Sequence, residues 1–256
     1  MLIYNTPQRT TRTHPPSMFL PAAIPHIMGD MLHAVDLGVG VTAHAVANVM
    51  FEVLPFYGGN MAEQVKNLQK ALLDWYKEHK IASRLEGKLT LDRLRCASSS
   101  FPKLKAKAAA SRNMVPFAVL LATKHNSGSD HDVRRLKMIE ELAVFYDTLK
   151  GEGRFFSRPA RDIIRRVGVS VPGLYATLTA DARVQGLRAW KLVPKFHIFQ
   201  HLCLYQAHLY GNPRFYWCYA DEDMVGQMVE VAQSCHPATM PATALFKWLV
   251  LHFEED

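Results

Sequence analysis

The sequence predicts a mainly α-helical protein, and three observations lead to this prediction. Hydrophobic residues make up 49% of the 256 residues, enough to bury a core. After residue 30, apolar side chains recur every three or four positions along most of the chain. Segments that could form strands are short, around 25–28 and 215–219. We therefore expect a single helical domain over 26–256, preceded by an extended arm over 1–25 that contains five prolines.

The charge and the cysteine content limit which partners and binding sites we expect. Lys and Arg number 30 against 23 Asp and Glu, a net charge of +7 that permits attraction to nucleic acid or an anionic membrane and fits an ordinary basic enzyme equally well. No apolar run approaches the roughly 20 residues of a membrane span, and the first residues lack the apolar core of a signal peptide. The four cysteines form no C-x-x-C pair. We expect a nuclear or cytoplasmic protein with no membrane partner, zinc knuckle or disulfide framework.

The first predicted helix runs from Asp30 to about Leu54, where Pro55 and a following glycine pair end it. Its polar residues share one face at 100° per residue; they are Asp30, His33, Asp36, His44, Asn48 and Glu52. Such a face is either solvated or functional. Carboxylates suit Mg²⁺ or Mn²⁺, and histidines can orient those carboxylates.

The second predicted helix begins after Asn60, because Asn60 and Glu63 have the spacing of a capping box. Pro102 leads into a basic helix that reaches Arg112. The other predicted helices span 90–96, 129–150, 157–168, 172–190, 194–210, 221–235 and 243–253.

Two further groups could carry chemistry. His197 and His201 lie four residues apart, and they could be buried and hydrogen-bonded, could contact DNA or an active site, or could ligate a metal. The acids Asp221, Glu222 and Asp223 start a predicted helix, where the helix dipole favours acids whatever their function and where they could also hold a metal.

Positive charge is concentrated in the middle of the chain, where it could meet backbone phosphates. The candidate nucleic-acid-binding residues are Lys103, Lys105, Lys107, Arg112 and Lys195. An alternative is a basic helix surface that binds nothing.

Three segments, in this order, resemble large eukaryotic cut-and-paste transposases with an RNase H-like catalytic core of the DDE type. They are Asp30-x-x-His33 followed by Leu-Gly, the stretch W-K-x-x-P-K-x-H-x-x-x-H over 190–201, and the acidic run over 221–223. The resemblance implies phosphodiester cleavage and strand transfer by two divalent metal ions, Mg²⁺ or Mn²⁺.

Carried over to this chain, the resemblance makes Asp30 the middle acid and His33 its accompanying histidine. Glu222 becomes the best candidate for the last acid, with Asp221 and Asp223 as rivals. Residues 26–59 and 211–256 would be remnants of the α/β core with a few short strands. Residues 60–210 would be a helical insertion.

The family's first acid has no counterpart before Asp30, so the resemblance implies a truncated or transposon-derived protein, inactive alone. A second copy in a homo-oligomer or a missing N-terminal segment would have to complete the site. One alternative is a non-enzymatic helical module that binds DNA or protein. Another is a metal-dependent phosphohydrolase of the HD type built on His131-Asp132.

Overall fold

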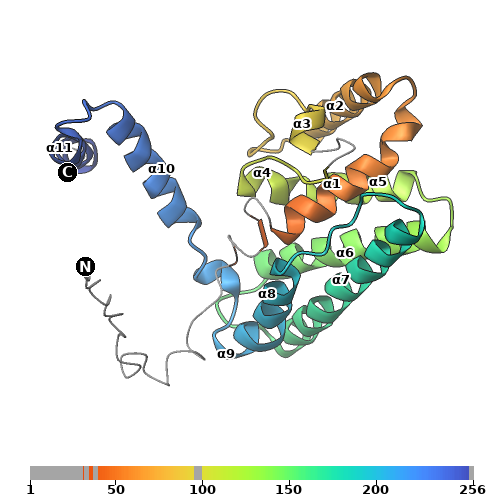
Figure 1. Ribbon diagram of the computed structural model, residues 1–256. Coiled ribbons are helices and arrows are strands. Elements are labelled where there is room, and N and C mark those ends of the chain that lie inside the picture. The colour runs from red at the N-terminus through yellow and green to blue at the C-terminus, as the bar shows by residue number, and fades with distance from the viewer. Residues whose placement is uncertain (1–30, 32–34, 37–39, 95–99, 254–256) are drawn as a thin grey trace, which may run out of the picture.

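The computed structural model describes residues 31, 35–36, 40–94 and 100–253, with the side chains of 219–223 and 251–253 left aside. This described part contains helices and no strand, which confirms the mainly α prediction (Figure 1). The expected strand at 215–219 is wrong, because the chain there makes a 3-10 turn, η6 (Pro213–Phe215), and α10 already begins at Tyr219. The segment 25–28 lies outside the described residues, as does the arm over 1–25.

The helical elements follow one another along the chain as α1 (Val41–Val53), η4 (Leu54–Tyr57), α2 (Met61–Glu78), α3 (Leu91–Leu94), α4 (Ala108–Asn113), α5 (Val115–Lys124), α6 (Asp130–Gly151), α7 (Arg158–Val184), α8 (Lys195–His201), η5 (Leu202–Gln206), α9 (Ala207–Leu209), η6, α10 (Tyr219–Gln233) and α11 (Met240–Phe253). Helix α1 is the centre of this arrangement and contacts α4, α5, α6 and α8 (Figure 1).

Helix α1 is buried on nearly every side. Its polar residues Thr42, His44 and Asn48 are buried together with its apolar ones. The solvated face that the sequence allows is therefore wrong for these residues. A helix surrounded by other helices must satisfy its polar groups within the protein.

Helix α1 also begins later than its sequence predicts. Gly40 is extended at the helix start, so Asp36 precedes α1 instead of sharing its face. A Cβ on Gly40 would lie 2.3 Å from the carbonyl oxygen of Val35, so only glycine permits this close approach. Asp30 and His33 lie outside the described residues.

The predictions for α2 and α6 are confirmed. The Asn60 side chain accepts from the backbone N–H groups of Ala62 and Glu63, and the Glu63 carboxylate accepts from the Asn60 N–H, which completes the capping box. Helix α6 begins after Ser129, whose hydroxyl accepts from the backbone N–H of Asp132.

Three predicted boundaries are wrong. The helix predicted to reach residue 190 ends at Val184. Helix α7 continues past Gly168 and through Pro172 instead of ending. A Cβ at Gly168 would lie 2.4 Å from Cβ of Cys203, so the glycine allows η5 to pack closely on α7. The basic helix after Pro102 is short, because α4 begins only at Ala108.

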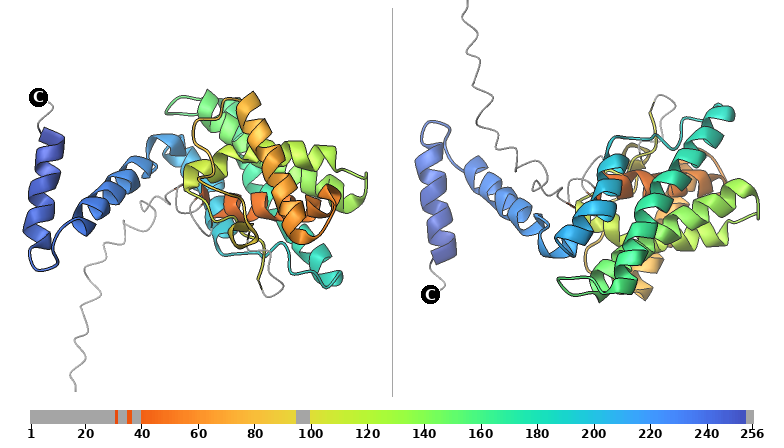
Figure 2. Two further views of the ribbon diagram at one scale, coloured as in Figure 1. Left: turned by 90° about the horizontal axis from the view of Figure 1, so that it is seen from above. Right: turned by 90° about the horizontal axis from the view of Figure 1, so that it is seen from below.

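Helices α10 and α11 pack on one another and stand apart from the other described helices, as Figure 2 shows from above and below.

Candidate functional site

A cleft of about 510 Å³ opens between α4, α5, α6 and the chain around η6. The buried side chains of Val115 and Leu149 form part of its apolar lining. Lys150 and Arg214 line it as exposed cations. Its volume falls within the roughly 300–1,000 Å³ typical of ligand sites.

One wall of the cleft combines a cation with an aromatic ring. The guanidinium of Arg112 lies 5.1 Å from the centre of the Trp217 ring, a cation-π distance. Arg214 Nη1 donates to the backbone carbonyl oxygen of Lys150 at 3.3 Å, which ties η6 to the end of α6. Among the described lining residues, the cleft presents three cations, Arg112, Lys150 and Arg214, against the carboxylate of Asp147.

Tyr146 connects this cleft to Asp36. Its side chain lines the cleft, and its hydroxyl donates to the buried carboxylate of Asp36. The Thr42 hydroxyl oxygen lies 3.2 Å from the Asp36 carboxylate and 2.5 Å from the Tyr146 oxygen, so the two hydroxyl protons serve two of the three contacts among these groups. These contacts hold Asp36 against α1 and α6.

The acidic run at 221–223 follows a residue of this cleft closely along the chain. Trp217 lines the cleft, and α10 starts two residues later with Asp221, Glu222 and Asp223 in its first turns. The helix predicted for this acidic run is confirmed. The side chains of the three acids lie outside the described set.

The basic candidates divide into two groups. Arg112 lines the cleft, whereas Lys103, Lys105 and Lys107 lie in the loop before α4 instead of on a helix. Lys105 pairs with Asp92 at 3.4 Å and Lys107 with Glu86 at 2.9 Å, both on the surface. Lys195 is partly buried at the start of α8.

His197 and His201 lie side by side on the exposed face of α8, with ring centres 4.5 Å apart. The interpretation that they are buried is wrong, because Phe196 and Phe199 occupy the inner face instead. Within the described residues, no group of three or more His, Cys, Asp or Glu side chains is arranged to hold a metal ion.

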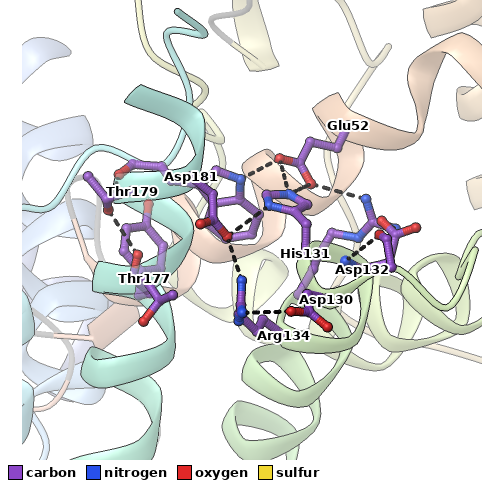
Figure 3. A network of polar contacts seen from close by, with 12 residues as sticks. Glu52, Asp130, His131, Asp132, Arg134, Thr177, Thr179 and Asp181 are labelled. Atoms are coloured by element: carbon purple, nitrogen blue, oxygen red, sulfur yellow. Dashed lines mark hydrogen bonds and ion pairs between the residues drawn. The ribbon is translucent and has the colours of Figure 1, made fainter. Parts of the chain in front are cut away.

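A buried ionic network, which the sequence does not reveal, joins α1, α6 and α7 (Figure 3). His131 Nε2 lies 3.0 Å from both carboxylate oxygens of Glu52, and its Nδ1 lies 3.4 Å from Asp181. Arg135, only 3% exposed, pairs with Glu52 at 3.0 Å, and Arg134 pairs with Asp181 at 3.1 Å. The hydrogen bond to Glu52 raises the pKa of His131, and the hydrogen bond to Asp181 adds to this effect. Burial of the imidazole lowers the pKa but does not cancel the rise.

This network argues against a metal role for the His131-Asp132 pair. His131 faces Glu52 and Asp181, while the Asp132 carboxylate accepts from the Ser127 backbone N–H and pairs with Arg135 at 2.8 Å. The two side chains of the pair therefore have different partners. The arrangement is that of ion pairs across helices.

Trp190, which opens the W-K-x-x-P-K stretch, belongs to the same network. Its side chain is fully buried, and its ring N–H donates to Glu52. Its backbone has a left-handed φ of 54°, which is held by two further hydrogen bonds: its N–H donates to the Asn48 side chain, and its carbonyl accepts from the Thr179 hydroxyl. Trp190 is a structural anchor in this fold.

His44 lies buried near the start of α1, with 3% of its surface exposed; neither ring nitrogen makes a hydrogen bond of good geometry, although the nearby Pro102 backbone opposes the fall in its pKa. Burial, followed by the charge of Lys103, lowers its pKa from 6.5 to about 4. The folded protein therefore holds His44 neutral where the unfolded chain would protonate it.

Replacing His44 with leucine should remove an acid-dependent loss of stability. A folded pKa of about 4 against 6.5 makes the wild type lose about 3 kcal/mol as pH falls from 6.5 to 4, at about 1.4 kcal/mol per pH unit. Urea unfolding at both pH values should show this difference between wild type and His44→Leu. The matched control, exposed His236→Leu, should follow the wild type; a His44→Leu variant that loses as much as the wild type would contradict the assignment.

Comparisons of this chain with protein-family models, with curated proteins and with solved structures give no match. The transposase resemblance is therefore carried by the sequence motifs alone. Among the described residues, no helix is both long enough and apolar enough to cross a membrane.

Proposed function

We propose that this chain is a transposase-derived, nucleic-acid-associated protein that binds DNA at the Arg112–Trp217 cleft and carries part of a phosphodiester-cleaving site that is inactive alone. One observation carries the proposal. Tyr146 contacts Asp36, six positions after Asp30, and lines the same cleft as Trp217, four positions before Asp221. Asp36 and Trp217, which are distant in the sequence and each close along the chain to a candidate acid, are thus linked through Tyr146 and a single cleft.

The charge of the cleft supports a nucleic-acid ligand. Arg112, Lys150 and Arg214 supply guanidinium and ammonium groups for phosphate oxygens, and Asp147 is the one carboxylate among the described lining residues, whereas the acids at 221–223 would face a bound metal ion. The chain as a whole carries +7. Both the local and the overall charge therefore attract a polyanion.

The donor set of the two segments suits a divalent metal, because Mg²⁺ and Mn²⁺ prefer carboxylate oxygens. Asp30 and Glu222 would hold it, with Asp221 or Asp223 as neighbours and His33 orienting Asp30. The metal would stabilise the charge that develops on the scissile phosphate. Asp36 is already hydrogen-bonded to Thr42 and Tyr146, so it serves to position the Asp30 segment.

DNA binding is the direct test. Affinity should fall steeply with salt, and Arg214→Gln should weaken binding and reduce the slope of log affinity against log salt by about 0.7, the value for one lost phosphate contact with a single strand. Lys77→Gln, on the exposed side of α2, is the matched control and should change neither quantity. Fluorescence anisotropy with a labelled DNA strand measures both. Absence of salt-dependent binding would refute the proposal.

Nicking of supercoiled plasmid separates an incomplete site from a complete one. The proposal expects no nicking by this chain alone with Mn²⁺. Mn²⁺-dependent nicking that is lost in both Asp30→Asn and Glu222→Gln would instead establish a complete nuclease. The proposal also expects Mn²⁺ to strengthen DNA binding through Asp30 and Glu222, so DNA binding that ignores both Mn²⁺ and the two substitutions, without nicking, would favour the non-enzymatic DNA-binding module.

A further inference from the structure

We propose that the cleft accepts an unstacked nucleobase against Trp217, so that the protein binds single-stranded nucleic acid in preference to duplex. This inference rests on the proposed function and specifies the ligand of the same cleft. It commits to a base with its attached phosphate, a planar ring that carries a negative charge.

The shape and lining of the cleft fit such a ligand. Its volume of about 510 Å³ would hold a nucleotide, and its lining from α5 and α6 is largely apolar. An apolar cleft of this kind suits the ring face of a base, because the hydrogen-bonding groups of a base lie on its edges. A smooth cationic surface without a cleft would suit a duplex backbone better.

Trp217 and Arg112 provide the stacking surface. Nucleobases stack on indole rings and on guanidinium planes, and here the two groups lie 5.1 Å apart in one wall. Trp217 is partly buried against the core and carries the Arg112 guanidinium over its ring, so a base would extend the stack of this pair. Tyr146 is held by Asp36 and Thr42, which keeps that side of the cleft fixed.

The polar residues of the cleft match the other parts of a nucleotide. Lys150 and Arg214 are exposed cations for the phosphates on either side of the base. Asn113 and Asp147 can contact the base edge, and a carboxylate can accept from the exocyclic amine of cytosine. An acidic peptide would carry its carboxylates towards Asp147 and would leave the stacking surface unused.

A duplex keeps its bases paired and stacked, so it cannot present one to Trp217 without the cost of unstacking. The duplex would meet only the cations. The preference for single strands should therefore depend on the ring of Trp217, while the contribution of phosphate contacts should not.

The test compares three labelled ligands of equal length by fluorescence anisotropy: an oligodeoxycytidine strand, an abasic strand with the same phosphates, and a duplex. The full chain should bind oligodeoxycytidine about tenfold more tightly than the abasic strand, the effect of stacking one base. Trp217→Leu should remove this difference and leave binding of the abasic strand within about twofold. Trp217→Phe should keep most of the difference. Trp248→Leu, on α11 outside the cleft, is the matched control and should behave as wild type.

Several outcomes would overturn the inference. Wild-type protein that binds the abasic strand or the duplex as tightly as oligodeoxycytidine has no base site, and salt-dependent binding of all three would leave the proposed function standing. No binding of any strand would refute the proposed function and the inference together. Displacement of oligodeoxycytidine by polyglutamate of equal charge would assign the cleft to an acidic peptide. The first comparison uses the unaltered protein, so it holds even if Trp217→Leu fails to fold.

Discussion

Replacing Glu52 with glutamine should lower the free energy of unfolding by about 3–5 kcal/mol, the cost of breaking a buried ion pair. The Glu52 side chain is 12% exposed and accepts from His131, Arg135 and the Trp190 ring. Glutamine has nearly the same shape but no charge, so Arg135 would lose its charged partner on α1. Urea unfolding near pH 6 measures the loss. Glu78→Gln on the exposed face of α2 is the matched control, and its effect should stay within about 0.5 kcal/mol.

The same substitution should change the pH dependence of stability. Because the folded pKa of His131 is raised, mainly by its hydrogen bond to Glu52, its stabilising charge is fully present below about pH 6.5. The wild type should therefore lose stability as pH rises from 6.5 through the raised pKa. Glu52→Gln should lose less over this interval. Equal losses in both proteins would contradict the assignment of the shift to Glu52.

Replacing Trp190 with alanine should destabilise the protein by a similar amount, about 3–5 kcal/mol, through the cavity left by a fully buried ring. The ring packs edge-to-face on Tyr175, with ring centres 5.2 Å apart, and donates its N–H to Glu52. Its backbone hydrogen bonds to Asn48 and Thr179 do not depend on the side chain. Thermal and urea unfolding of Trp190→Ala test this prediction.

Trp190→Phe separates the packing of the ring from its hydrogen bond. Phenylalanine keeps an aromatic ring but cannot donate to Glu52, so its cost should be about 1–2 kcal/mol. A Phe variant as unstable as the Ala variant would show that the hydrogen bond dominates. Loss of DNA binding by a fully folded Trp190→Phe variant would contradict the structural role of Trp190.

Most of the helices could be predicted from local signals in the sequence. The capping box of Asn60 and Glu63, the serine before α6 and the serine before α7 are local signals, since each is completed by hydrogen bonds within a few residues. Local signals failed at Gly168 and Pro172, where α7 continues, because packing on η5 fixes that stretch of the helix.

The burial and the partners of the polar side chains depend on the tertiary structure. The periodicity predicts that His44, Asn48 and Glu52 lie on one side of a helix. Only the surrounding helices bury that side, and they give Glu52 its partners on α6 and the ring N–H of Trp190. The cleft needs residues from four separate segments. A sequence pattern gives the face on which a side chain lies; the free energy of burying or pairing its charge depends on neighbours that are distant in the chain.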